Sequence, residues 1–145
     1  MSLGLYLHIP YCFSKCRYCD FYSRPGERGV PDAYVEALVR ELDRFAPERP
    51  LQPDTLYFGG GTPSLLRPEQ AKRLIDAAQP MPGAEITLEA NPETVTEQSL
   101  AGFREAGVNR ISFGVQSARD TQLRTLGRPS GGCLPKAESG SIFNR

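Results

Sequence analysis

The sequence of 145 residues has no apolar run near the roughly 18 residues that a membrane-spanning helix needs. It also has no excess charge of either sign. Seventeen basic and seventeen acidic residues give a net charge of zero, which argues against a broad basic face for nucleic acid or anionic lipid. The first residues show no basic segment followed by an apolar one, and lipidation motifs are lacking. We therefore expect a cytoplasmic protein with no integral membrane segment and no nucleic-acid partner.

Glycine and proline are plentiful, at 14 and 13 residues, and they predict many turns between short elements. The apolar and charged fractions are those of a globular domain. Segments rich in β-forming residues cover residues 5–9, 55–58, 85–89 and 108–115. Segments with the apolar periodicity of a helix cover residues 31–45, 68–78, 96–106 and 117–126.

This alternation of strand and helix predicts an α/β fold in which crossover helices cover the outside of parallel strands. A complete eight-stranded α/β barrel needs roughly 250 residues, so we expect about four βα units of a partial TIM barrel. The apolar stripe of the first helix extends to Phe45, and Thr96 is a candidate N-cap for the third helix. Ser117 and Asp120 resemble a capping box at the start of the fourth helix, with two leucines after it facing inward.

Chemically useful residues follow all four predicted strands. Three cysteines lie in the loop of residues 11–29 after the first strand, and a glycine-rich segment, residues 59–62, follows the second. Glu89 ends the third strand and Gln116 follows the fourth. Because the carboxyl ends of parallel strands meet at one edge of a sheet, these residues predict a single site there.

Cys12, Cys16 and Cys19 place three thiols within eight residues. An odd number of clustered cysteines with no sign of secretion argues against disulfides. A zinc ion would need a fourth ligand, for which His8 is the candidate, in a structural module without catalytic activity. A 4Fe-4S cluster bound by three cysteines would instead keep one iron open. We favour the iron–sulfur cluster and keep the zinc module as the alternative.

Four motifs together resemble the radical S-adenosylmethionine (radical SAM) superfamily. Residues 6–19 (YLHIPYCFSKCRYC) resemble its cluster-binding signature. Residues 59–64 (GGGTPS), 89–92 (EANP) and 107–117 (GVNRISFGVQS) resemble the branch that holds oxygen-independent coproporphyrinogen III oxidases and haem chaperones. The resemblance runs in collinear order from about Leu5 to Arg128.

The resemblance implies that the three cysteines hold three irons and that SAM chelates the fourth. One electron from a reductant protein would then cleave a C–S bond of SAM and give a 5′-deoxyadenosyl radical, with the protein positioning the cofactors. Nine residues would line the SAM pocket by the same resemblance, with Phe21 supplying apolar surface: Tyr6, Tyr18, Phe21, Gly60, Gly61, Thr62, Glu89, Gln116 and Arg128.

Phe21 also bears on which branch the chain resembles. The oxidases carry a fourth cysteine two positions after the third, where this sequence has Phe21, as on the haem chaperone side. We therefore expect haem as the partner. The alternative is a porphyrinogen substrate, with oxidative decarboxylation of coproporphyrinogen III to protoporphyrinogen IX.

The sequence changes character after Arg128. We expect residues 1–128 to form the partial radical SAM domain and residues 129–145 to be a divergent, disordered tail in which Cys133 has no role in the site. The remaining βα units of the family have no counterpart here. The chain therefore resembles a truncated copy, and we expect it not to complete catalysis alone.

Overall fold

The computed structural model describes residues 2–25, 29–45 and 50–128, so the predicted tail lies outside the described residues. Its centre is a parallel sheet with the strand order β1-β4-β5-β6. These strands span Gly4–Ile9 (β1), Thr55–Gly60 (β4), Glu85–Ala90 (β5) and Arg110–Phe113 (β6). Because each new strand adds beside the previous one, the predicted parallel α/β arrangement is confirmed.

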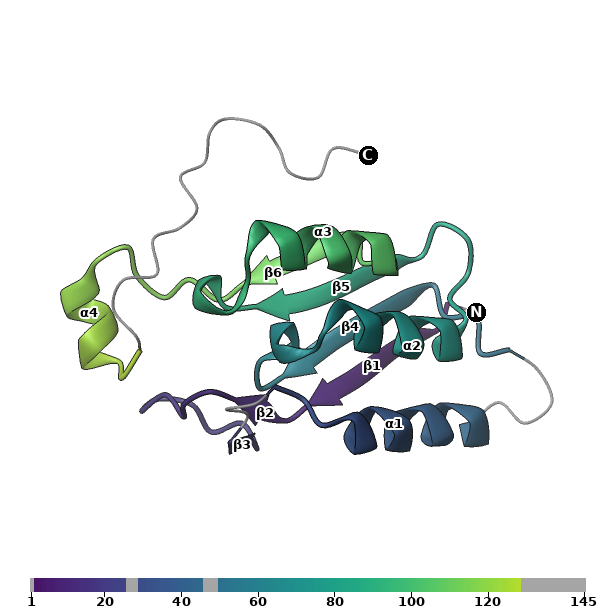
Figure 1. Ribbon diagram of the computed structural model, residues 1–145, viewed down its shortest axis with the longest axis horizontal. Coiled ribbons are helices and arrows are strands. Elements are labelled where there is room, and N and C mark those ends of the chain that lie inside the picture. The colour runs from purple at the N-terminus through teal and green to yellow at the C-terminus, as the bar shows by residue number, and fades with distance from the viewer. Residues whose placement is uncertain (1, 26–28, 46–49, 129–145) are drawn as a thin grey trace.

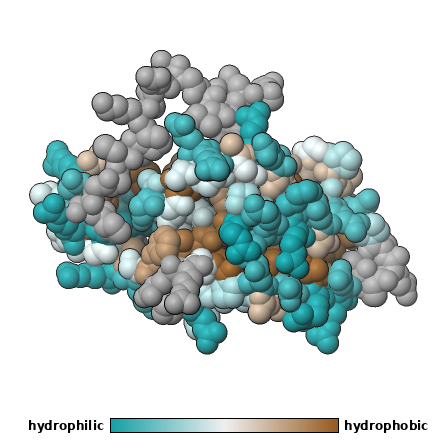
Figure 2. Space-filling model, in the orientation of Figure 1, coloured by the Kyte–Doolittle hydropathy of each residue, from teal (hydrophilic) through white to brown (hydrophobic). Residues whose placement is uncertain are grey.

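Three helices cover one face of this sheet (Figure 1). They span Asp32–Phe45 (α1), Pro68–Ala78 (α2) and Glu97–Ala106 (α3). A fourth helix, α4 (Asp120–Thr125), lies beyond the carboxyl ends of the strands, on the left in Figure 1. Figure 2 shows hydrophilic side chains over much of the helical layer, with hydrophobic surface between them. No described helix is long and apolar enough to cross a membrane.

The core lies between the sheet and the helices. Strand side chains alternate between the two faces, and Leu56, Phe58 and Leu88 are fully buried on the helix side. Val35 of α1 and Phe103 of α3 are fully buried against them. Burying each side chain of this size contributes about 1.5–3 kcal/mol. The alternation of apolar residues along each strand therefore determines which face of the sheet the helices cover.

One prediction about helix ends holds and two are wrong. Thr96 caps α3 as predicted, because its hydroxyl accepts a hydrogen bond from the Ser99 N–H at 3.1 Å. Phe45 does not join the buried stripe of α1 and is 74% exposed, because the buried positions of that helix end one turn earlier. The capping box at Ser117 is wrong as well. Its hydroxyl accepts from the N–H of Arg119, so α4 begins three residues later than predicted. The two leucines of this segment are half-buried.

The sequence did not predict four short elements at the carboxyl end of the sheet. Two are short strands that pair in parallel, β2 (Tyr11–Cys12) and β3 (Arg24–Pro25), inside the segment expected to be a loop. Two are single 3-10 turns, η1 (Pro63–Leu65) and η2 (Pro92–Thr94), which follow β4 and β5. These elements give regular structure to the segments that follow β1, β4 and β5.

The buried amide of Gln70 ties α1 to α2. Its Nε2 donates to the carbonyl of Val30 at 2.9 Å and to Asp32 Oδ1 at 2.8 Å, and its Oε1 accepts from the N–H of Arg67 at 2.9 Å. The hydrogen bonds from Gln70 and then from Arg67 hold the pKa of Asp32 below its usual value. This network fixes the start of α1, and hence the end of the cysteine-bearing segment before it.

The other face of the sheet is polar. Tyr6 of β1 lies beside Tyr57 of β4 in the register, and Glu89 of β5 lies beside Ser112 of β6. The Tyr6 side chain is 54% exposed. The helix-free face therefore carries hydroxyl and carboxylate groups toward the edge where the predicted site residues lie.

Candidate functional site

A cavity of about 230 Å³ opens at the carboxyl end of the sheet. The segments after all four strands of the main sheet contribute to its wall. Eleven of the twelve predicted site residues line it: Cys12, Cys16, Cys19, Tyr18, Phe21, Gly60, Gly61, Thr62, Glu89, Gln116 and Arg128. The exception is Tyr6. The structure thus brings together residues up to 116 positions apart in the sequence, while their roles stay predictions.

The three cysteines are half-buried free thiols on one wall of this cavity. Cys12 lies in β2, and the Cys19 N–H donates to the carbonyl of Cys16 at 3.1 Å, which closes a turn between the other two. No three His, Cys, Asp or Glu side chains of the described residues converge on a single metal ion. In a 4Fe-4S cluster each cysteine binds a different iron, so the three sulfurs need not meet at one metal ion.

His8, the candidate fourth zinc ligand, lies elsewhere. Its Nδ1 is 3.2 Å from the Tyr6 hydroxyl, and its ring packs over Gly60, where an added Cβ would approach within 2.7 Å. It is not among the residues that line the cavity with the cysteines. A zinc site of three cysteines and His8 therefore finds no support in this arrangement.

The glycine-rich segment after β4 packs directly against the cysteine segment. A Cβ on Gly61 would lie 2.6 Å from the Tyr11 carbonyl oxygen and 3.0 Å from Cys12 Sγ. Backbone hydrogen bonds join the same two segments, from Thr62 N–H to the Tyr11 carbonyl at 2.7 Å and from Gly61 N–H to the Ile9 carbonyl at 2.8 Å. Gly60 adopts a φ of 115°, which favours glycine. This close packing of glycine backbone beside three thiols fits a cluster held by the cysteines, with a cofactor close to the backbone.

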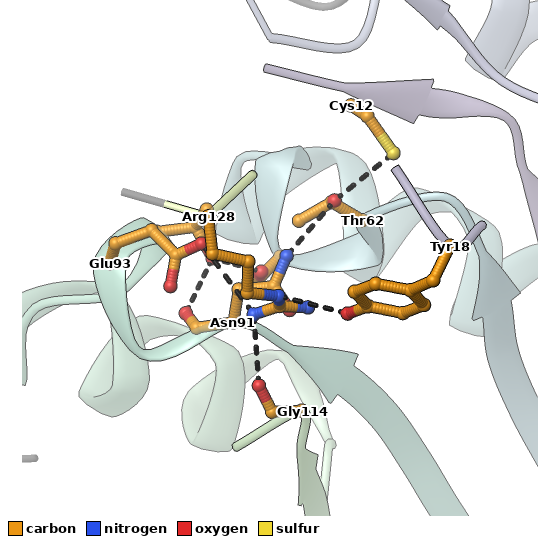
Figure 3. Close-up of polar contacts among 9 residues, drawn as sticks. Cys12, Tyr18, Thr62, Asn91, Glu93, Gly114 and Arg128 are labelled. Carbon is orange, nitrogen blue, oxygen red and sulfur yellow. Dashed lines mark hydrogen bonds and ion pairs between the residues drawn. The ribbon is translucent and has the colours of Figure 1, made fainter. Parts of the chain in front are cut away.

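Hydrogen bonds run from Cys12 to Tyr18 across the site (Figure 3). The Thr62 hydroxyl donates to Cys12 Sγ at 3.4 Å, and it accepts from Asn91 Nδ2 at 3.3 Å. Asn91 Oδ1 accepts in turn from an NH2 group of Arg128 at 3.2 Å. Arg128 Nε then donates to the Tyr18 hydroxyl at 3.1 Å. These contacts fix the cysteine loop to the ends of β4 and β5.

Arg128 is the centre of this network. Its side chain is only 11% exposed, and besides Asn91 and Tyr18 it donates to the carbonyl of Gly114 at 3.0 Å and approaches Glu93 at 3.8 Å. Burial raises the pKa of Tyr18, and the hydrogen bond from Arg128 opposes that shift. The phenol therefore stays neutral near pH 7 and holds the loop as an acceptor from the guanidinium.

Glu89 enters the cavity from β5 with its own support. The Tyr57 hydroxyl donates to Glu89 Oε1 at 2.7 Å, and the Tyr57 ring stacks on Tyr6 with centroids 6.0 Å apart. The hydrogen bond to Glu89, and then burial, raise the pKa of Tyr57. Tyr6 therefore does not line the cavity itself. It contacts Tyr57, whose hydroxyl is bonded to Glu89.

Sequence reasoning missed Asn91 and Tyr57 as parts of the site. Asn91 could have been found, because it belongs to the EANP motif, one of those on which the family resemblance rests. Tyr57 is one of a run of strand-forming residues and gave no such signal. Its contact depends on the register between β4 and β5.

Comparison with known families and proteins gives a consistent result. The Radical SAM superfamily matches residues 6–132. The chain is 45% identical over 137 residues to "Heme chaperone HemW" of Escherichia coli (strain K12), covering 89% of this chain and 36% of that protein. It is 43% identical to "Radical S-adenosyl methionine domain-containing protein 1, mitochondrial" of Bos taurus, covering 86% of this chain and 29% of that protein.

A solved structure shares the fold. Coproporphyrinogen III oxidase (HemN) from Escherichia coli superimposes with a TM-score of 0.76 at 31% identity, covering 90% of this chain and 31% of that one. The chain thus spans about a third of the length of these relatives. Both the resemblance drawn from the motifs and the partial-barrel fold are confirmed.

Proposed function

This chain belongs to the radical SAM superfamily, and we propose that it is the part of a haem chaperone that binds a 4Fe-4S cluster and SAM. One observation carries the proposal. Three free thiols and eight of the nine SAM-pocket residues surround a single cavity at the carboxyl ends of four parallel strands. Ligand sites of parallel α/β folds lie at this edge.

Cys12, Cys16 and Cys19 would hold the cluster, whose open iron and single transferable electron supply the cleavage of the C–S bond in SAM. The chain's own part is to hold and orient. Gly61 leaves room beside Cys12, and the Thr62 hydroxyl donates a hydrogen bond to its sulfur. A hydrogen bond donated to a thiolate stabilises the deprotonated form that binds iron.

SAM would occupy the rest of the cavity. The Glu89 carboxylate, held by Tyr57, can accept hydrogen bonds from the amino group or the ribose hydroxyls. Tyr18 and Phe21 offer aromatic surface to the adenosyl group. Arg128 fixes Tyr18 and the end of β6, so it would set the width of the pocket on that side.

Phe21 supports the chaperone over the oxidase. It lines the cavity, is 65% exposed, and has no atom that can bind a metal. The chain is also 45% identical to a haem chaperone and 31% identical to the coproporphyrinogen III oxidase of the same species. Decarboxylation of coproporphyrinogen III stays the second candidate, since the oxidase shares the fold.

Metal analysis of cysteine variants tests the cluster. After anaerobic reconstitution with iron and sulfide, Cys12→Ala, Cys16→Ala and Cys19→Ala should each abolish cluster assembly. Cys133→Ala should keep the iron content of the unmodified chain. Equal iron content in all four variants, or zinc in place of iron, would contradict the assignment.

A chimera tests the choice of partner. The chain joined to the C-terminal part of a haem chaperone relative should bind haem, and it should form no protoporphyrinogen IX from coproporphyrinogen III under reducing, anaerobic conditions. Turnover to protoporphyrinogen IX would favour the oxidase. Phe21→Cys restores the cysteine of the oxidase pattern, so it should change haem binding or decarboxylation by the chimera. A variant that leaves both activities as they were would contradict the choice.

A further inference from the structure

The hydrogen bonds that end at Cys12 have a fixed direction along their whole length (Figure 3). A guanidinium has only donors, so Asn91 Oδ1 accepts from Arg128, at 3.2 Å. This contact fixes which end of the amide points the other way, and Asn91 Nδ2 donates to Thr62 Oγ1 at 3.3 Å. Because the amide can only donate to this oxygen, the single proton of the Thr62 hydroxyl is left to point at Cys12 Sγ, 3.4 Å away.

The surroundings of Thr62 remove other uses for its proton. Thr62 is 3% exposed, so water hardly competes for the hydroxyl. Among the described residues, Cys12 Sγ is the only atom to which this hydroxyl donates. The Arg128 side chain is 11% exposed and is itself held by the Gly114 carbonyl at 3.0 Å. The direction of the hydrogen bond at Cys12 is therefore set two residues away, by Arg128.

The backbone already joins the glycine-rich segment to the cysteine segment without this side-chain contact. The Thr62 N–H donates to the Tyr11 carbonyl at 2.7 Å, and the Gly61 N–H donates to the Ile9 carbonyl at 2.8 Å. A hydroxyl donating to a sulfur 3.4 Å away adds little to that attachment. It does place the positive end of an O–H dipole beside the sulfur of Cys12, in a site from which solvent is largely excluded. The contact therefore fits an electrostatic role better than a structural one.

We propose that Thr62, Asn91 and Arg128 form a donor relay that raises the reduction potential of the cluster, an inference that rests on the proposed function. Hydrogen bonds to the sulfurs are among the factors that set the potential of an iron–sulfur cluster. A donor beside a cysteine sulfur stabilises the reduced cluster more than the oxidised one, because the reduced cluster carries one more negative charge. The Thr62 hydroxyl contacts the sulfur, and Asn91 and Arg128 are positioning residues that act through it.

Potentiometric titration of the full 145-residue chain, reconstituted anaerobically and followed by electron paramagnetic resonance, measures this potential. Thr62→Val removes the hydroxyl and keeps the shape of the side chain. At a fixed applied potential it should lower the ratio of reduced to oxidised cluster by about tenfold, which is about 59 mV for one electron. Thr62→Ser keeps a hydroxyl and should restore the potential. The matched control is Thr87→Val, at a threonine that is 1% exposed and donates to Glu85, and it should leave the potential unchanged.

Asn91→Asp tests the direction of the relay. A carboxylate only accepts, so the Thr62 hydroxyl would turn toward it and leave the sulfur without its donor. The potential should fall, partly through the added charge. In the Thr62→Val background the charge acts alone, so the fall caused by Asn91→Asp should be smaller there. Shifts that simply add would overturn the proposal, as would an equal fall in Thr62→Val and Thr87→Val.

The same variants without a cluster separate this proposal from the proposed function. If no cluster assembles in the unmodified chain, the proposed function fails, and urea unfolding then tests the relay. Asn91→Asp should cost less unfolding free energy when Thr62 is present than in the Thr62→Val background, because only the hydroxyl can donate to the new carboxylate. Additive costs would overturn the relay. If the cluster assembles and every variant has the same potential, the relay fails while the proposed function stands.

Discussion

At the scale of single residues, the hydrogen bonds of Arg128 and Asn91 join four segments of the site. The guanidinium has several donors in a fixed plane, and here they reach Tyr18, Asn91 and Gly114. The amide of Asn91 uses both its ends, accepting from Arg128 and donating to Thr62. Because the Arg128 side chain is largely buried and Asn91 is half-buried, removing either one leaves polar groups of the other without a partner.

The variant Arg128→Lys keeps the charge and loses the planar set of donors. We expect it to lower the free energy of unfolding by about 1–3 kcal/mol, because two acceptors lose their partner. SAM affinity of the reconstituted chain should fall by about tenfold, which corresponds to about 1.4 kcal/mol. Urea unfolding and equilibrium binding measure the two effects. Arg124→Lys, exposed and without a side-chain partner, should stay within about 0.5 kcal/mol of the unmodified chain. Equal behaviour of both variants would contradict the role of Arg128.

Tyr57 gives a prediction about pH. The folded state raises the pKa of Tyr57, through the hydrogen bond to Glu89 first and burial second. The resulting stability is fully present below the unfolded pKa of about 10 and is lost as pH rises through the folded pKa. The variant Tyr57→Phe keeps the ring and lacks this titration. Its difference in unfolding free energy from the unmodified chain should therefore shrink above about pH 10. A difference that stays constant with pH would contradict the prediction.

At the scale of elements, the sequence predicts the regular parts well. Prolines and glycines mark the ends, and apolar periods of two and 3.6 mark the interiors, so α2 spans its predicted range and β1 starts one residue early. The strand pair β2–β3 depends on a contact from Arg24 N–H to the Pro10 carbonyl, across 14 residues. Such pairing leaves no periodic pattern in two-residue strands. The cysteines, glycines and Glu89 were predictable from motifs, whereas Tyr57 depended on strand register.

The contact between the glycine segment and β2 gives the prediction at this scale. Gly61→Ala adds a Cβ against the backbone of Tyr11, which cannot move aside as a flexible side chain could. We expect the cysteine segment to shift, with loss of cluster assembly and about 1–3 kcal/mol of stability. The control is Gly83→Ala, where φ is 82° but no atom lies within 4 Å of the added Cβ. That variant should lose about 1 kcal/mol to backbone strain and keep its iron content. Iron assays and thermal unfolding compare the two, and full iron content in Gly61→Ala would contradict the packing argument.

At the scale of the whole molecule, the sheet is one-sided. Helices cover one face, and the polar face with Tyr6 and Glu89 has no second layer in the described residues. The outer strands β1 and β6 each pair with one neighbour within the main sheet, and Phe113 at the end of β6 is 41% exposed. The relatives are about three times as long as this chain. The cavity nevertheless takes its walls from the described residues alone.

At this scale, we expect the cavity to hold a cluster with one open iron that SAM binds. Electron paramagnetic resonance of the reconstituted, dithionite-reduced chain, with and without SAM, detects both the cluster and the binding of SAM to it. We expect about four irons per chain and a spectrum that changes when SAM is added. The spectrum should not change with 5′-deoxyadenosine, which lacks the amino and carboxylate groups that would chelate iron. If the chain took up zinc without iron, or if saturating SAM left the cluster spectrum unchanged, this cavity would not be the site of a SAM-binding cluster.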